Sequence, residues 1–199
     1  MKKFFNTPIT TSLMAMILLV VLFSFNALAA PKWTISLAEK APIKKVVVTG
    51  NTRVTIVQSN VDMVKMDYLD MDKVSVKQMG NTLTVHSSER DPIVVFVYVR
   101  DIYRIVASGD ANVSTSGKFA VKNLQVMLRE QATARIKATT ESLYTAISDQ
   151  AQLKLLGNTD NHSYLMAGSA KIDTNKFAAL QRVNMSTEEI TASVQKKIK

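Results

Sequence analysis

The fold is decided by the stretch LQVMLREQATARIKA at residues 124–138, which returns in outline as LYTAISDQAQLKLLG at residues 143–157. When the two stretches are aligned, similar residues coincide: Leu124 with Leu143, Leu128 with Ile147, Glu130 with Asp149, Gln131 with Gln150, Ala132 with Ala151 and Ile136 with Leu155. A short unit that recurs at a fixed period is typical of stacked coils, because no single coil can bury its own apolar face.

Each unit contains two strands and a polar corner. Apolar residues alternate with polar ones on both sides of the corner at residues 129–131, and a period of two residues indicates a strand rather than a helix. A similar offset places residues 105–111 on residues 126–132. We therefore expect an all-β fold, a right-handed parallel β-helix (a solenoid) with coils of about 19–21 residues.

An earlier segment, residues 46–54, extends the pattern toward the N-terminus. Its apolar and glycine positions match those of residues 105–113. Three coils of about 20 residues would span the distance between the two segments. In this interval, Gly80-Asn81 either closes a local hairpin or rounds a corner of the solenoid, and the sequence is compatible with both.

Residues 1–29 have the layout of a secretory signal peptide. Two lysines precede an apolar run at residues 13–25 and a small-x-small cleavage site at residues 27–29. The run is shorter than the ~20 apolar residues that a membrane-spanning helix needs. We therefore expect a signal peptide at 1–29, no membrane span after its cleavage, and an exported protein in the periplasm, at the cell surface or in the medium.

The rest of the chain, residues 30–199, is expected to form a single β-helix domain. Residues 30–45 are a polar lead, 46–100 contain the N-terminal strands, and 101–199 contain the repeated coils. At its end, residues 186–194 fit a capping helix by their first residues, but their alternating apolar positions favour one more strand. The chain has no cysteine, which excludes a disulfide framework and a thiolate metal site.

The residues that usually carry catalysis or bind metals form no recognisable motif. His86 and His162 are the two histidines, and neither has a glutamate at metal-ligand spacing, so both are expected to be polar loop residues at the surface. The acidic run DYLDMD at residues 67–72 lacks the glycine turn of a calcium loop. We expect no metal, no cofactor and no enzymatic activity.

One pair of carboxylates leaves an enzymatic alternative open. Stacked coils would place Glu130 and Asp149 within about 5–6 Å, close to the separation in a retaining glycosidase. The alternative function is thus a β-helix carbohydrate-active enzyme that uses these two residues. Equally, both can be corner acids that face water and are balanced by Arg129, Arg135 and Lys154, because solenoid corners are commonly polar.

The preferred function is that of a non-enzymatic interaction module of the cell envelope. Stacking would place Arg135 over Lys154, with Lys171 nearby, and Gln131 over Gln150 in a side-chain hydrogen-bond ladder. The full chain has a net charge of +9, or about +7 without Lys2 and Lys3 of the expected signal peptide. A positive exported protein suits an anionic polysaccharide or another cell-surface component. Nucleic acid is not expected, because no aromatic residues interleave a dense basic stripe.

The corner segments also resemble a known family. The stretches TGNTRVTI (49–56), GNTLTV (80–85) and IVASGDANV (105–113) resemble the strand-and-turn motifs of the bacterial head GIN domain family of adhesin-like autotransporter proteins. The resemblance covers residues 46–194, although only residues 108–110 keep the family's Ser-Gly-Asp corner. It implies an exported adhesin-like protein, a fold similar to β-helix proteins, and no established catalytic residues.

Overall fold

The computed structural model describes residues 32–36 and 41–185 of the chain. The expected signal peptide at 1–29 and the expected final strand at 186–194 lie outside the described residues. In the described ranges, a short 3-10 helix, Tyr68–Asp70, accompanies these strands: β1 Lys32–Ser36, β2 Lys45–Gly50, β3 Thr52–Gln58, β4 Met63–Asp67, β5 Ser75–Met79, β6 Thr82–Ser87, β7 Ile93–Val99, β8 Arg104–Ser108, β9 Asn112–Ser116, β10 Asn123–Leu128, β11 Thr133–Ile147, β12 Gln152–Met166 and β13 Lys171–Asn184. The all-β class is confirmed.

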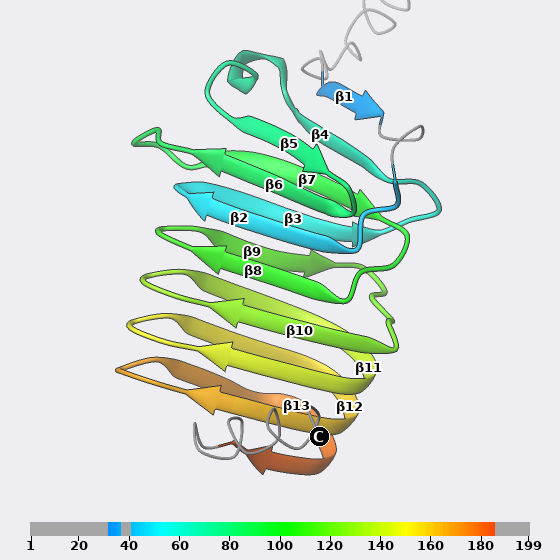
Figure 1. The fold of residues 1–199 in the computed structure, drawn as a ribbon, viewed down its shortest axis with the longest axis vertical. Coiled ribbons are helices and arrows are strands. Elements are labelled where there is room, and N and C mark those ends of the chain that lie inside the picture. Colours follow the sequence, from blue (N-terminus) through cyan, green and yellow to red (C-terminus); the bar gives the residue numbers. More distant parts are fainter. Residues whose placement is uncertain (1–31, 37–40, 186–199) are drawn as a thin grey trace, which may run out of the picture. The chain divides into compact units, whose positions relative to one another are not determined.

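The strands form two walls, one in front of the other in Figure 1. The first wall contains β6, β2, β8 and β10 and continues through the C-terminal parts of β11, β12 and β13. The second wall contains β7, β3 and β9 and continues through the N-terminal parts of the same three strands. The long strands β11 to β13 therefore belong to both walls and bend from the second into the first.

The register between successive coils is the one that the repeat predicts. Leu124 of β10 lies opposite Leu143 of β11 in the next coil, and Val126 lies opposite Ile105 of β8 in the coil before. The alternation explains this register, because a slip of one residue would turn every core side chain toward solvent. These pairings are parallel, as expected for stacked coils.

The expectation of three coils between residues 46–54 and 105–113 was wrong. The structure pairs β2 directly with β8 and β3 directly with β9, so that Val46 lies opposite Ile105 and Val54 opposite Val113. The residues between them form β4 to β7, on the far side of the first coil: β6 pairs with β2, and β7 pairs with β3. The chain therefore leaves the first coil, builds the layer above it and returns below it (Figure 1).

The sheet is mixed, so a purely parallel solenoid is not what the structure contains. Among the described strands, β1 with β4, β4 with β7, and β5 with β6 are antiparallel pairs. The Gly80-Asn81 turn closes the β5–β6 hairpin, which resolves the two alternatives left by the sequence. Paired strands that are joined by a two-residue turn are antiparallel, because paired parallel strands need a long crossover.

The polar lead expected at 30–45 contains β1 and the first residue of β2.

The core lies between the walls and is largely aliphatic. The first wall contributes the column Val48, Ala107, Leu128 and Ile147, and the second contributes Val54, Val113, Ala134 and Leu153. All of these side chains are buried. Each column mixes small residues with large ones, so the walls can approach each other closely at these positions.

Candidate binding wall

The outward face of the second wall carries two columns of polar side chains in register. The first column is Arg53, Asn112, Thr133, Gln152 and Lys171. The second column is Thr55, Ser114, Arg135, Lys154 and Asp173. We call this surface the ladder wall, because neighbouring strands repeat the same positions about 4.8 Å apart.

In the ladder wall, hydrogen bonds between short side chains join β9 to its two neighbours, β3 and β11. The Asn112 amide donates a hydrogen bond to the Thr133 hydroxyl at 2.9 Å. The hydroxyl oxygens of Thr55 and Ser114 lie 3.3 Å apart and share a hydrogen bond. Such pairs between adjacent strands stabilise a sheet and fix side-chain positions. The wall therefore presents an ordered polar surface.

Three of the five predicted binding residues meet in one hollow. Arg135, Lys154 and Lys171 line a hollow of about 360 Å³ together with Thr133, Gln152 and the Asp173 carboxylate. Arg135 and Lys171 are exposed, and within the described residues neither has an acidic side chain at ion-pair distance. Unpaired cations on an ordered wall are available to a bound anion.

The third cation is already paired. The Lys154 ammonium lies 2.8 Å from a carboxylate oxygen of Asp173. The hydrogen bonds from the Lys154 side chain and from the Asn175 backbone N–H hold the pKa of Asp173 below its ordinary value of 3.8. Asp173 is therefore ionised at neutral pH and offsets one of the three positive charges.

The other two predicted binding residues lie elsewhere. Gln131 and Gln150 are exposed at the corner that joins the walls, outside the lining of the hollow. Their coils are joined by the Gln150 backbone N–H, which donates to the carbonyl oxygen of Glu130 at 3.0 Å. The expected side-chain ladder is not observed, because no hydrogen bond joins the two amide groups in the described part of the chain. Ser169 donates instead to the carbonyl oxygen of Asp149.

Glu130 and Asp149 hold the corner together. An oxygen of the Glu130 carboxylate accepts the Gly109 backbone N–H at 2.6 Å, and an oxygen of the Asp149 carboxylate accepts the Glu130 backbone N–H at 2.9 Å. Each acid thus bonds to the equivalent residue of the preceding coil. The hydrogen bonds from the Glu130 N–H and the Ser148 hydroxyl lower the pKa of Asp149 below its ordinary value.

Both corner acids also adopt a backbone conformation that favours glycine. Glu130 has φ of 60° and Asp149 has φ of 62°, like Gly109 in the coil before them and Gly168 in the coil after them. The sequence contained this signal, since the repeat places both acids at the glycine position of the corner. The left-handed region is costly for a residue with a Cβ, so the carboxylate hydrogen bonds stabilise a strained turn.

A pair of substitutions separates backbone strain from hydrogen bonding at this corner. Glu130→Gly and Glu130→Ala both remove the bond to Gly109, but only alanine keeps the Cβ that strains a φ of 60°. We expect Glu130→Ala to be less stable than Glu130→Gly by about 1 kcal/mol. Urea unfolding followed by far-UV circular dichroism measures the difference, and equal midpoints would show that the corner is unstrained.

The histidines do not share one environment. His86 is exposed on β6, between the hydroxyls of Thr49 and Ser88. The expectation of surface loops was therefore right for His86 only in its exposure. It was wrong for His162, which lies within β12 and is only 2% exposed. The register explains its burial, because His162 lies opposite the core residue Leu143. Within the described residues, no three His, Asp or Glu side chains gather to hold a metal ion.

The comparisons with known proteins assign the chain to a family. The model of the family described as "Putative auto-transporter adhesin, head GIN domain" matches residues 42–196. This chain belongs to the head GIN domain family. The match begins just before β2 and covers both walls, so the head GIN domain contains the ladder wall, the corner and the core described above. No curated protein matches the chain.

Two solved structures share the fold of this head GIN domain. One is a "putative adhesin" from Parabacteroides distasonis ATCC 8503, with 14% identity, a TM-score of 0.57, and coverage of 77% of this chain and 76% of the other. The second is a "Putative lipid binding protein" from the same organism, with 12% identity, a TM-score of 0.56, and 77% coverage of both chains. At this level of identity the similarity establishes the fold.

Proposed function

We propose that this head GIN domain is a non-catalytic, adhesin-like module that acts outside the cytoplasm and binds anionic polysaccharide at the ladder wall. The signal-peptide layout of residues 1–29 supports export to the periplasm, the cell surface or the medium. In the described part of the chain no helix has the length and apolar character of a membrane span. We also propose that the parallel coils wind in the right-handed sense.

The grouping of Arg135, Lys154 and Lys171 around one hollow carries this proposal. Two of the three cations lack an acidic partner within the described residues, and ordered amide and hydroxyl groups surround them. Polar groups that repeat at strand spacing along a wall suit an extended ligand that repeats its own polar groups. A carboxylate or sulfate on each repeating unit would complement the cations.

The corner geometry argues against the enzymatic alternative. Both carboxylates of the Glu130–Asp149 pair are used to accept backbone N–H groups of adjacent coils. We therefore propose that these acids stabilise the fold.

A charge-removal variant tests the proposed function. The triple variant Arg135→Gln, Lys154→Gln and Lys171→Gln should lose at least about tenfold in affinity for a carboxylated or sulfated polysaccharide, because each charged hydrogen bond contributes ~1.5–3 kcal/mol at most and less when exposed. Asp173→Asn should act in the opposite sense, since it frees Lys154. Affinity is measured by retention on immobilised polysaccharide across a range of salt concentrations.

A matched control keeps the loss of charge equal. Lys45→Gln, Lys77→Gln and Arg90→Gln remove the same amount of positive charge from strands β2 and β5 and from the β6–β7 connection, away from the ladder wall. If this control weakens retention as much as the triple variant, binding reflects net charge and the proposed site is wrong. Release of new reducing ends by the unmodified protein would instead restore the enzymatic alternative.

A further inference from the structure

In the last coils, polar side chains occupy column positions that are aliphatic in the earlier coils. Along the first wall, one column reads Leu83, Val46, Ile105 and Val126, and then continues with Thr145 and Tyr164. A second column reads Leu124 and Leu143, and then continues with His162 and Arg182. Polar side chains therefore replace aliphatic ones along these columns; Thr145 and His162 are buried, Tyr164 is half-buried and Arg182 is exposed. Burial of a polar group without a hydrogen bond is costly.

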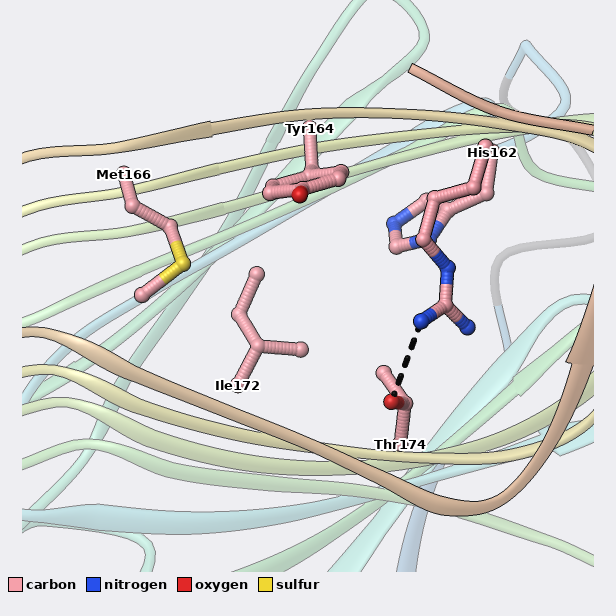
Figure 2. A pocket seen from close by; sticks show the side chains of 6 residues that line it. His162, Tyr164, Met166, Ile172 and Thr174 are labelled. Carbon is pink, nitrogen blue, oxygen red and sulfur yellow. Dashed lines mark hydrogen bonds between the residues drawn. The ribbon is translucent and has the colours of Figure 1, made fainter. Parts of the chain in front are cut away.

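These side chains surround a cavity between the walls. It has a volume of about 160 Å³ and is lined by His162, Tyr164, Met166, Ile172, Thr174 and Arg182. Figure 2 shows the labelled side chains converging on this space from two sides, with the hydrogen bond to Thr174 across one end. The apolar and polar residues lie on different parts of the lining, so the cavity is amphipathic.

An irregularity in β13 helps to form the cavity. Between Lys154 and Leu156 of β12 the register with β13 shifts, and Thr174 lies at this bulge. The Asp173 carboxylate supports the bulge by accepting the Asn175 backbone N–H at 3.0 Å. Bulges redirect side chains and are frequent beside binding sites.

The buried histidine leaves one ring nitrogen without a partner. His162 Nε2 lies 3.0 Å from the Thr145 hydroxyl, whereas Nδ1 is buried and has no hydrogen-bond partner within the described residues. Burial, aided by the charge of Arg182, lowers the pKa of His162 to about 4, so the ring is neutral at pH 7. When the Thr145 hydroxyl donates to Nε2, the neutral ring carries its proton on Nδ1, and when Nε2 carries the proton it donates to Thr145.

The ring is also held in position by its neighbours. Its centroid lies 5.4 Å from that of Tyr164 and 5.4 Å from that of Phe177, and the contact with Phe177 is edge-to-face. Aromatic pairs in these orientations are favourable and restrict rotation. The ring nitrogen Nδ1 is thus held in a fixed position without a hydrogen-bond partner among the described residues.

Arg182 adds a positive charge to the same cavity. Its guanidinium donates to the Thr174 hydroxyl at 3.3 Å, and in the described residues no carboxylate lies within ion-pair distance of it. A guanidinium can bind a carboxylate through two parallel hydrogen bonds. The cavity therefore combines a cation, a buried imidazole and an apolar floor formed with Met166 and Ile172.

We propose that this cavity binds a small amphiphilic carboxylate, with the carboxylate bound by Arg182 and the apolar body against Met166 and Ile172. A cavity of about 150 Å³ accommodates one benzene molecule. The available volume therefore fits an apolar group of about six carbon atoms, as in hexanoate or benzoate. This site lies apart from the hollow in the ladder wall and does not depend on the polysaccharide proposal.

Calorimetric titration of the purified full chain with hexanoate and benzoate tests the site. We expect saturable binding with a dissociation constant on the order of 0.1–1 mM, given the small number of ligand atoms. Hexanamide has the same apolar body without the charge and should bind at least about tenfold more weakly. Amide chemical-shift changes in an NMR titration should centre on β12 and β13.

Three variants decide whether binding uses this cavity. Arg182→Gln removes the charge from an exposed side chain and should weaken hexanoate binding at least about tenfold. Met166→Trp fills the cavity from a position that is 42% exposed and should abolish binding while the fold is kept. Arg135→Gln lies on the ladder wall and should leave binding unchanged. No binding to the unmodified chain, equal binding of hexanamide, or full binding by Arg182→Gln and Met166→Trp would overturn the proposal.

Discussion

Gly50→Ala should unfold at a much lower urea concentration than the unmodified protein, with a loss of about 3–5 kcal/mol. Gly50 ends β2 at φ of 70°, where a Cβ would lie closer than 3.0 Å to the backbone carbonyl oxygen of Ser87 in β6. That oxygen also accepts the Asn51 backbone N–H at 3.0 Å. The methyl group would therefore strain the turn and force the first coil away from the layer above it.

A second glycine separates the two parts of this loss. Gly117 has φ of 74°, but a Cβ there would have no atom within 4 Å. Gly117→Ala should therefore cost only the left-handed strain, about 1–2 kcal/mol. The comparison is made from urea midpoints and slopes of both variants by circular dichroism. Equal losses for the two variants would contradict the proposed clash with Ser87.

Asp62→Ala should destabilise the protein by about 3–5 kcal/mol, again measured by urea unfolding. The Asp62 side chain is only 3% exposed and connects three segments. Its carboxylate accepts the Ile43 N–H at 3.1 Å, the Arg100 N–H at 2.9 Å and the Arg100 guanidinium at 3.1 Å. Removal would leave the N–H of Ile43 without an acceptor beside a fully buried side chain, and it would leave the Arg100 cation unpaired.

The same residue predicts a pH dependence. Burial acts to raise the pKa of Asp62, but the hydrogen bonds from Arg100 and Ile43 and the charge of Arg100 outweigh it and lower the pKa below 3.8. A lowered pKa contributes stability above pH about 4, and this contribution is lost as the pH falls through the folded-state value. With urea midpoints taken at each pH, Asp62→Asn should therefore lose less stability than the unmodified protein between pH about 5 and about 2.

An exposed ion pair provides the control for both measurements. Lys44 and Asp101 lie 2.7 Å apart, but their side chains are 36% and 58% exposed. Asp101→Ala should cost under about 1 kcal/mol, because solvent screens exposed pairs. A loss at Asp101 as large as that at Asp62 would show that burial and backbone contacts do not distinguish the two acids.

Local alternation made the strands and most of the register predictable. Leu128 must face inward with Ile147 above or below it, since a slip by one residue would expose both. The positions of the corners were also predictable, because the repeat aligns Glu130 with Gly109, and both residues have a positive φ. The contacts that stabilise the corner could not be predicted, since only the tertiary structure determines which backbone N–H group each carboxylate accepts.

The position of the early strands could not be derived from the pattern. Strands β6 and β8 present the same inward alternation to β2, as Leu83 and Ile105 on either side of Val46 show. Because β6 and β8 have the same alternation, either strand could pair with either edge of β2. The order of the layers therefore depends on connections across the whole domain. The Asp62 contacts, which tie the start of the first coil to the end of β7, are one such connection.

The sequence by itself determined the all-β class, the length of the later coils and the inward face of their strands, because these follow from the alternation along each strand and the spacing of about 19–21 residues between the later repeats. Only the tertiary structure decided which layer lies on which, that three of the five predicted binding residues share a hollow, and that His162 faces a cavity. Those features depend on contacts between residues distant in the chain and on a bulge in β13, and neither leaves a local periodic signal.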